Sequence, residues 1–301
     1  MARQVQPLTP RVAPGRRIPG SLAALLAALA RNRPQVATRR DLEALIDDHG
    51  WDLDAERTAR QLQRLGWFVP LHLKGVWAFL PAGQDEITDP YVDLRGWQAK
   101  EPKAAFALAG EAAAWHLGYL NRRFDGPVAV WVPAKIRLPY GLRAHLSVVT
   151  LGWRAEDAPR LGPTPAFLLR RHLDLTDWAG GLPAFGPEAL AVQLAARPAS
   201  FAPWADLVAH LDQFAGDVDV DRLAGLLATQ STSAWQRASY LLDQGGRHDD
   251  AMTLLERRPV ETMPKVQFGA GPRGVWAPEF CLTDRLIAPL RDRGPSPRPP
   301  P

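Results

Sequence analysis

The stretch Thr38–Pro81, TRRDLEALIDDHGWDLDAERTARQLQRLGWFVPLHLKGVWAFLP, contains the clearest secondary-structure signals of the N-terminal part of the chain. Thr38 can be the N-cap of a helix, with Asp41 three residues later as a weak capping box. Asp54 can cap a second helix, which Gly66 would end. The stretch therefore predicts two successive helices, each with its start signal in the sequence.

The second of these helices has two distinct faces. Small and apolar side chains fall on one side: Ala55, Ala59, Leu62 and Leu65. Polar and basic side chains fall on the other: Arg57, Arg60, Gln61 and Arg64. An arginine can bind guanine through two hydrogen bonds, and a glutamine can pair with adenine. We expect this face to contact DNA bases, the alternative being an ordinary solvated helix surface.

A β-hairpin follows the basic helix. Trp67–Val69 predicts a strand, Lys74-Gly75 fits a turn, and Val76–Phe79 fits the returning strand. A further helix with apolar residues at helical spacing, Leu22–Ala30, precedes the stretch. Three helices, the third of them basic, and then a hairpin is the order of a winged helix-turn-helix. That fold inserts one helix into the major groove.

Four more side chains are candidate DNA contacts. Arg39 and Arg40 lie in the first turn of the preceding helix, where the helix N-terminus adds its own amides to an anion site. His72 and Lys74 lie at the predicted hairpin tip and suit contact with the minor groove or the backbone. For each of them the alternative is a surface charge without a partner.

Charge is unevenly spread along the 301 residues. Residues 1–80 hold 12 Lys and Arg against 7 Asp and Glu, a net charge of +5, whereas the whole chain carries +4. The rest of the chain therefore carries −1. A basic excess on the part predicted to read DNA is the asymmetry expected if that part meets phosphates.

The number of cysteines and the hydropathy of the chain indicate the cellular compartment in which the protein is expected. Cys281 is the only cysteine, so no intrachain disulfide can form, which fits a reducing cytoplasm. No apolar run approaches the roughly 20 residues needed to span a membrane. Arg16-Arg17 before Leu22–Ala30 could mark a secretory leader, but that run keeps helical spacing and Ser21 can cap it. We expect a cytoplasmic protein.

Composition divides the chain into four parts. We expect a disordered basic tail at 1–20, the winged helix-turn-helix at 21–89, a larger C-terminal domain at 90–290 and a disordered Pro-rich tail at 291–301. A polar linker is expected over 82–96. The C-terminal domain is expected to be mixed but mostly helical, so the fold class is α+β. Its predicted helices lie near 104–120, 187–196, 203–214, 219–229, 234–244 and 248–257; its predicted strands lie near 127–133, 145–151, 166–169, 264–268 and 274–277.

Signals of catalysis or metal binding have simpler interpretations. The run Gly269–Gly274 matches G-x-G-x-x-G, but no helix follows it, so we expect the turn of a hairpin. Asp217, Asp219 and Asp221 lack the Gly and Glu of a calcium loop and suit the start of a helix. Cys281 has no motif around it and is expected to be a buried thiol. The sequence therefore predicts no enzyme, no cofactor and no metal site.

Two stretches resemble a known family. The first comprises "VATRRDLEAL", "ERTARQLQRLGWF" and "GVWAFLPAG" in order; the second is "SAWQRASYLLDQGG", Ser233–Gly246. With them the chain resembles the AbiEi family, the antitoxin half of type IV abortive-infection toxin–antitoxin systems. The likeness covers most of residues 21–290. The long N-terminal tail and the loop-rich region 152–186 depart from the family pattern.

The resemblance implies a function for each domain. The winged helix would bind inverted repeats in the promoter of its own operon and repress it, with self-association on the DNA as an option. The C-terminal domain would counteract a nucleotidyltransferase-like toxin, directly or indirectly. Basic residues of the late helices, such as Arg237 and Arg247, are candidates for that effect, and structural ion pairs are the alternative.

Two alternatives from other classes stay open. One is a winged-helix regulator whose C-terminal domain senses a small molecule. The other is a nuclease with a DNA-reading N-terminus, although Glu261 and Lys265 are separated by Pro264 and form no convincing catalytic cluster. A nucleotidyltransferase gene beside this one would favour the antitoxin.

Overall fold

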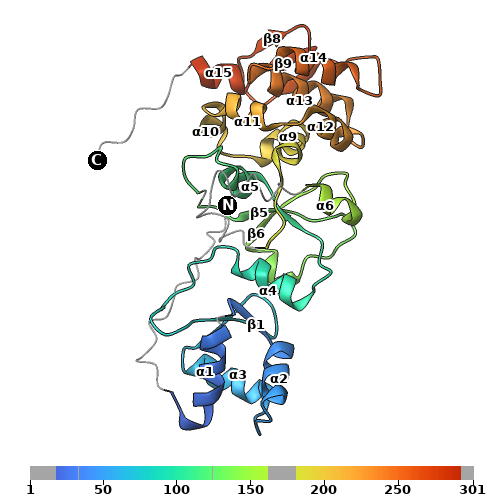
Figure 1. Ribbon diagram of the computed structural model, residues 1–301. Coiled ribbons are helices and arrows are strands. Elements are labelled where there is room, and N and C mark those ends of the chain that lie inside the picture. The colour runs from blue at the N-terminus through green and yellow to red at the C-terminus, as the bar shows by residue number, and fades with distance from the viewer. Residues whose placement is uncertain (1–17, 33, 124, 162–180, 293–301) are drawn as a thin grey trace, which may run out of the picture. The chain divides into compact units, whose positions relative to one another are not determined.

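The computed structural model describes residues 18–32, 34–123, 125–161 and 181–292, which belong to two compact units (Figure 1). The N-terminal unit comprises the chain up to Ala104 together with a later segment, Leu138–Leu146. The C-terminal unit comprises Ala105–Arg137 and the chain from Ser147 onward. The backbone therefore joins segment 138–146 at both of its ends to the C-terminal unit.

The N-terminal unit combines helices with one small sheet. Strand β3 lies at the centre of that sheet and pairs antiparallel with β1 and with β2. In chain order the elements are η1 (Gly20–Leu22), α1 (Ala23–Asn32), β1 (Val36–Thr38), α2 (Arg39–Asp48), α3 (Ala55–Arg64), β2 (Phe68–Pro70), β3 (Val76–Phe79), α4 (Val92–Lys100) and η2 (Tyr140–Leu142).

The predicted start signals of α2 and α3 and the predicted stop signal of α3 are confirmed. The Thr38 hydroxyl accepts a hydrogen bond from the Asp41 amide at 3.2 Å, while the Asp41 carboxylate accepts one from the Thr38 amide at 2.8 Å. The Asp54 carboxylate caps α3 by accepting from the Arg57 amide at 2.7 Å. Gly66 follows α3 with φ +76°, a conformation that glycine adopts without a steric penalty.

A continuous apolar core holds these elements together. Leu25, Leu29, Leu42 and Leu62 are buried in one cluster with aromatic residues of the hairpin. Full burial of one such leucine contributes roughly 1.5–3 kcal/mol. The aromatic members of the cluster are Trp67, Phe68, Trp77 and Phe79.

Strand β1 and helix α4 of the N-terminal unit were not predicted. β1 pairs with β3 in the register Val36↔Ala78, and α4 packs against β1 and β3. Gly96 of α4 lies so close to the hairpin that a Cβ there would be 2.8 Å from Leu71 Cδ1. The linker expected over 82–96 is therefore shorter, and the boundary expected at residue 89 falls before a helix that belongs to this unit.

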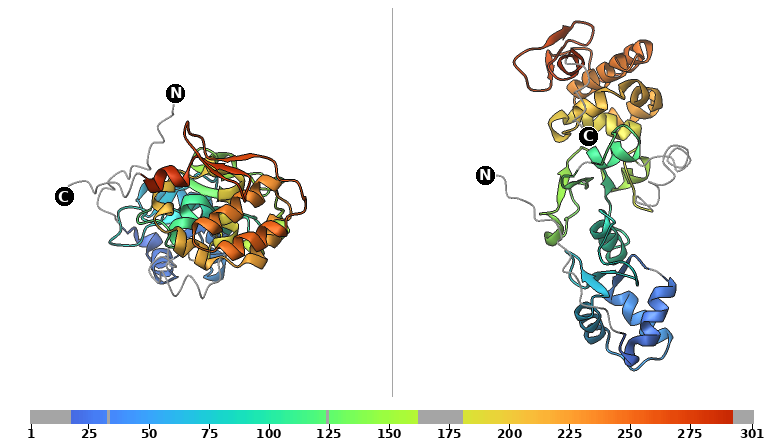
Figure 2. Two further views of the ribbon diagram at one scale, coloured as in Figure 1. Left: turned by 90° about the horizontal axis from the view of Figure 1, so that it is seen from above. Right: turned by 90° about the vertical axis from the view of Figure 1, so that its left-hand side faces the viewer.

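The C-terminal unit contains more helix than strand. Helix α13 packs against α9 and α14, and α12 packs against α9 (Figures 1 and 2). The mixture of helices and strands confirms the α+β class. The elements are β4 (Ala107–Leu108), α5 (Gly110–His116), β5 (Val128–Trp131), β6 (Leu146–Val149), η3 (Ala155–Asp157), α6 (Ala158–Leu161), α9 (Pro187–Ala196), η4 (Pro198–Ser200), α10 (Trp204–Val208), α11 (Leu211–Asp217), α12 (Val220–Leu227), α13 (Thr232–Gln244), α14 (His248–Glu256), β7 (Val266–Phe268), β8 (Val275–Ala277), β9 (Leu282–Asp284) and α15 (Ile287–Asp292).

Two predictions for the C-terminal unit were wrong in detail. The helix expected over 104–120 begins only at Gly110, because Ala107–Leu108 pairs with β5 and tertiary pairing overrides local helix propensity. Residues 269–274 are not the turn of a hairpin. β7 and β8 do not pair with each other, and β9 lies between them, parallel to β7 and antiparallel to β8.

Several other expectations have mixed outcomes. Asp219 caps α12 by accepting from the Arg222 amide at 2.9 Å, as predicted. Cys281 is only half-buried. The strand expected near 166–169 and most of the tails 1–20 and 291–301 lie outside the described residues.

Candidate nucleic-acid interface

Helix α3 separates its side chains as the sequence predicts. Ala55, Ala59 and Leu62 are buried, while Leu65, just past the end of the helix, is half-buried. The candidate base contacts lie on the opposite, solvent-facing side. Of these, Arg57, Arg60 and Arg64 are exposed and Gln61 is half-buried.

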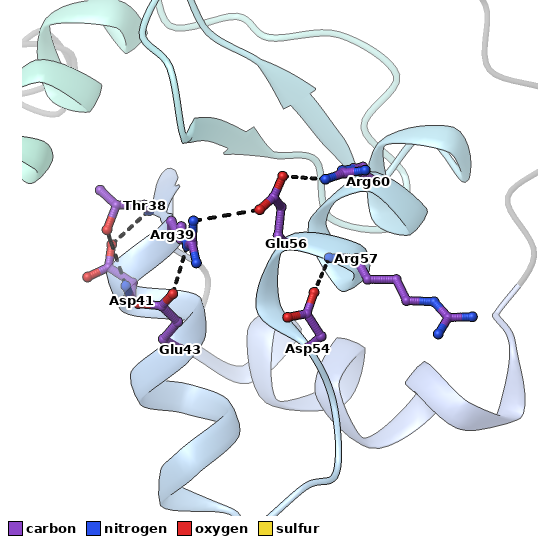
Figure 3. A network of polar contacts seen from close by, with 8 residues as sticks. All are labelled: Thr38, Arg39, Asp41, Glu43, Asp54, Glu56, Arg57 and Arg60. Atoms are coloured by element: carbon purple, nitrogen blue, oxygen red, sulfur yellow. Dashed lines mark hydrogen bonds and ion pairs between the residues drawn. The ribbon is translucent and has the colours of Figure 1, made fainter.

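An acidic residue links two of the basic candidates. Glu56, in the first turn of α3, forms an ion pair with Arg60 and a longer one, 3.6 Å, with Arg39 of α2 (Figure 3). Arg39 also forms an ion pair with Glu43 of its own helix at 2.7 Å. The network places side chains of α2 and α3 side by side on one exposed surface.

The network alters the acid–base properties of its members. The hydrogen bond from Arg60, and then its positive charge, lower the pKa of Glu56 below the ordinary value. Glu56 is thus held as a carboxylate by the arginines that are candidates for DNA contact. A phosphate that approached Arg60 or Arg39 would compete with this carboxylate.

The remaining arginines of the surface have no such competitor. Arg40, Arg57 and Arg64 are exposed and form no ion pair with any described residue. In Figure 3 the Arg57 side chain extends away from the Glu56 network. Its guanidinium keeps its full set of donors for a bidentate acceptor such as a phosphate or the edge of guanine.

The two candidate residues at the hairpin tip, His72 and Lys74, have different surroundings. Lys74 is exposed, and Gly75 with φ +74° makes the turn. His72 is instead engaged within the unit: its Nδ1 lies 2.8 Å from Asp93 Oδ2, and its amide donates to Asp93 Oδ1 at 3.0 Å. The His72 ring also stacks on His145, with 3.6 Å between ring centroids. No sequence pattern indicated these partners.

Two basic residues of the C-terminal unit, suggested by sequence, bind backbone carbonyls. Arg237 of α13 donates to the carbonyls of Ala195 and Gln267 at 3.1 and 2.9 Å. Arg247 donates to the carbonyls of Ala215 and Val218 at 2.7 and 2.5 Å and forms an ion pair with Asp250 at 2.7 Å. Both guanidinium groups therefore bridge segments of the fold.

Other polar residues of the motif Ser233–Gly246 act in the same way. The Gln236 amide nitrogen donates to the carbonyls of Pro264 and Phe280, both at 2.9 Å. The Tyr240 hydroxyl donates to Asp284 at 2.9 Å, and that buried carboxylate accepts the Ile287 amide at the start of α15. These hydrogen bonds connect α13 to the sheet formed by β7, β8 and β9 and to the segments beside it.

Metal clusters and membrane-spanning helices are both absent from the described residues. They contain no group of three or more His, Cys, Asp or Glu side chains that could hold a metal ion. Within the same residues, no helix has the length and apolar character to cross a membrane. Among the Trp residues of the C-terminal unit, Trp131, Trp153 and Trp235 are buried, whereas Trp276 on β8 is 45% exposed.

Comparisons with known proteins agree with this architecture. The family model described as the AbiEi antitoxin C-terminal domain matches residues 104–244, which include all of α13. The crystal structure of the RV2827C protein from Mycobacterium tuberculosis is similar with a TM-score of 0.86 and 49% sequence identity, over 94% of this chain and 97% of that one. A search of curated proteins gives no match. The chain therefore belongs to the AbiEi antitoxin family.

Proposed function

We propose that this protein is the antitoxin and transcriptional autorepressor of a toxin–antitoxin operon. Its N-terminal unit acts as a winged helix-turn-helix that binds inverted repeats in the operon's promoter. Its C-terminal unit counteracts a nucleotidyltransferase-like toxin in the cytoplasm, and the protein itself catalyses no reaction. Family membership supports the antitoxin role.

One observation carries the DNA-binding part of the proposal. Exposed Arg57 and Arg64 have no acidic partner among the described residues and lie on α3 opposite its buried apolar side. α3 is followed by an antiparallel hairpin, as the recognition helix of a winged helix-turn-helix would be. We assign Arg57, Arg60, Gln61 and Arg64 to base contacts. The Arg39 and Arg40 side chains, at the start of α2, are assigned to phosphates.

The binding experiment uses the full chain and a duplex of the upstream region. Fluorescence anisotropy titrations at two salt concentrations give the affinity and its salt dependence. Wild-type protein should bind the upstream duplex more tightly than a scrambled duplex. The triple variant Arg57→Ala/Arg60→Ala/Arg64→Ala should lose this preference.

Two controls make the experiment decisive. Arg154→Ala removes an 81% exposed arginine of the C-terminal unit and should leave the affinity unchanged. Arg40→Ala should weaken binding to both duplexes alike, as a phosphate contact would. Unchanged affinity in the folded triple variant would exclude α3 as the reader.

The antitoxin part has a separate test in cells. Co-expression with the toxin encoded by the adjacent gene should be tolerated with wild-type protein and with the triple variant, since neutralisation is assigned to the C-terminal unit. Loss of rescue in the triple variant would show that neutralisation depends on DNA binding. An adjacent gene of another class would favour the small-molecule regulator.

A further inference from the structure

The surface around the hairpin tip contains a second lysine that no sequence motif marks. Lys100, the last residue of α4, is exposed, and its Nζ donates to the carbonyl of Lys74 at 2.9 Å. The Lys100 ammonium group therefore lies at the backbone of Lys74, whose own side chain is exposed. An ammonium group has three donors, so Lys100 keeps two for an anion.

Segment 138–146 also lies against the tip. A Cβ at Gly141 would lie 1.9 Å from the carbonyl oxygen of His72, so the backbones are in direct contact there. Four residues later the His145 ring stacks on the His72 ring. Arg143 lies between these two contacts in the sequence and is exposed. The segment therefore presents an arginine beside the hairpin tip.

The acidic residues close to this surface are engaged. Asp93 binds the ring and the amide of His72, and Glu101 accepts a hydrogen bond from the Trp97 indole at 3.1 Å. Lys74, Lys100 and Arg143 outnumber these two carboxylates. A basic surface built from three separate pieces of chain suits the phosphates of a nucleic-acid backbone, which are bound without regard to sequence.

We propose that the DNA-binding surface extends beyond the hairpin, with Lys100 and Arg143 as contacts to backbone phosphates and His145 as a positioning residue. The proposal rests on the proposed DNA-binding function and deepens it. His72, bound to Asp93 and stacked on His145, joins segment 138–146 to the tip instead of contacting DNA. The segment, continuous in sequence with the C-terminal unit, thereby takes part in DNA binding.

Salt dependence tests the two phosphate contacts. The logarithm of the affinity falls linearly with the logarithm of the salt concentration. Removal of one phosphate contact should make this slope less steep by about one. Lys100→Gln keeps a donor for the Lys74 carbonyl but removes the charge, and Arg143→Gln removes the charge at the second position. We expect each variant to bind specific and scrambled duplexes more weakly, with the ratio of the two affinities unchanged. Arg154→Gln, the matched control, should keep the wild-type slope.

A double-mutant cycle tests the positioning residue. If His145 acts by placing Arg143, His145→Ala should lower the slope, and adding Arg143→Gln should lower it no further. His145→Phe retains a ring that can stack on His72 and should retain the wild-type slope. Full additivity of His145→Ala and Arg143→Gln would overturn the positioning role.

The outcomes separate this inference from the proposal on which it rests. If wild-type protein binds neither duplex, the DNA-binding function itself is wrong. If wild-type protein binds and the α3 triple variant does not, but Lys100→Gln and Arg143→Gln keep the wild-type slope, only the extended surface is wrong. A changed preference between duplexes in Lys100→Gln would also overturn it, because a phosphate contact carries no sequence information.

Discussion

Two arginines of α3, Arg57 and Arg64, and two at α13 and its C-terminal flank, Arg237 and Arg247, have opposite surroundings. Arg57 and Arg64 are exposed, and their guanidinium groups meet no described carboxylate. Arg237 and Arg247 each donate to two backbone carbonyls from distant parts of the chain. The guanidinium donors of Arg57 and Arg64 are thus free for a ligand, whereas those of Arg237 and Arg247 bind the fold itself. What a guanidinium can bind depends on how many donors the fold leaves to it.

This contrast assigns different kinds of mutational effect to the two units. Loss of a free arginine should remove a DNA contact of the proposed interface and leave the fold unchanged. Loss of a bridging arginine leaves carbonyls without donors and weakens the packing of segments that it joined. Binding and stability measurements on matched variants can therefore test whether the two groups of arginines have these different roles.

The largest effect is expected for Arg237→Ala. The side chain is half-buried, burial lowers its pKa, and its two hydrogen bonds hold the C-terminal end of α9 and strand β7 to α13. Hydrogen bonds to charged groups contribute about 1.5–3 kcal/mol, so we expect a loss of about 3 kcal/mol in unfolding free energy. Denaturant unfolding monitored by circular dichroism measures it, and DNA affinity at a permissive temperature should not change.

Arg154→Ala is the matched control for this stability loss. Arg154 is 81% exposed and pairs with Glu156 at 3.6 Å, so its removal should change stability by less than about 0.5 kcal/mol. Equal stability losses in the two variants would contradict the bridging role of Arg237.

Local sequence signals predicted α2, α3 and the hairpin because each signal and its effect lie within a few residues. The Thr38–Asp41 capping box and the Asp54 cap are such signals. The environment of His72 could not be predicted in this way, because Asp93 is 21 residues away and His145 further still. For Arg237 the sequence suggested a structural ion pair, whereas its partners are carbonyls, which every residue offers and no pattern marks.

The next effect is expected for Arg64→Ala. Arg64 is exposed in the last turn of α3 and has no described ion-pair partner. If it binds a base through two hydrogen bonds, its removal should cost about 1–3 kcal/mol of specific binding, with little change on a scrambled duplex. Anisotropy titration with both duplexes distinguishes this from a phosphate contact, which would weaken both equally.

A smaller and opposite effect is expected for Glu56→Gln. Glu56 competes with phosphate for Arg60 and Arg39 and adds a negative charge to the proposed interface. Its neutralisation should raise the affinity for any duplex about two- to fivefold, in line with the weakness of exposed ion pairs. Glu43→Gln, which neutralises a carboxylate paired with Arg39 alone, should raise it less. A lower affinity in Glu56→Gln would indicate that the carboxylate positions Arg60.

The Glu56–Arg60 spacing of four residues was visible in the sequence, and such pairs are common on helices. Lys100 carried no comparable signal, because its role depends on α4 packing against the hairpin. The helices and the hairpin of the N-terminal unit up to residue 81 could thus be predicted from local rules, whereas strand β1 could not. The rest of the candidate surface depends on contacts between segments that only the folded chain brings together.

The smallest effects should come from two histidines that respond to pH in opposite directions. Burial, and then the neighbouring His72, lower the pKa of His145 below its ordinary value of 6.5, against the opposing charge of Asp93. The folded N-terminal unit thus binds fewer protons at this site than the unfolded chain. The contribution of His145 to stability is complete above about pH 6.5 and declines as the pH falls below it.

The pKa of His248, in the C-terminal unit, is shifted in the opposite direction. A hydrogen bond to Asp243, at 2.8 Å, raises its pKa above 6.5. Its contribution is complete below about pH 6.5 and is lost as the pH rises through the raised pKa. On acidification, we expect the Tm of wild type to fall relative to that of His145→Phe. Over the same change in pH, we expect the Tm of wild type to rise relative to that of His248→Gln. Thermal melts between about pH 5 and pH 8 measure both, and shifts of the same sign would show that one of the two environments is wrongly assigned.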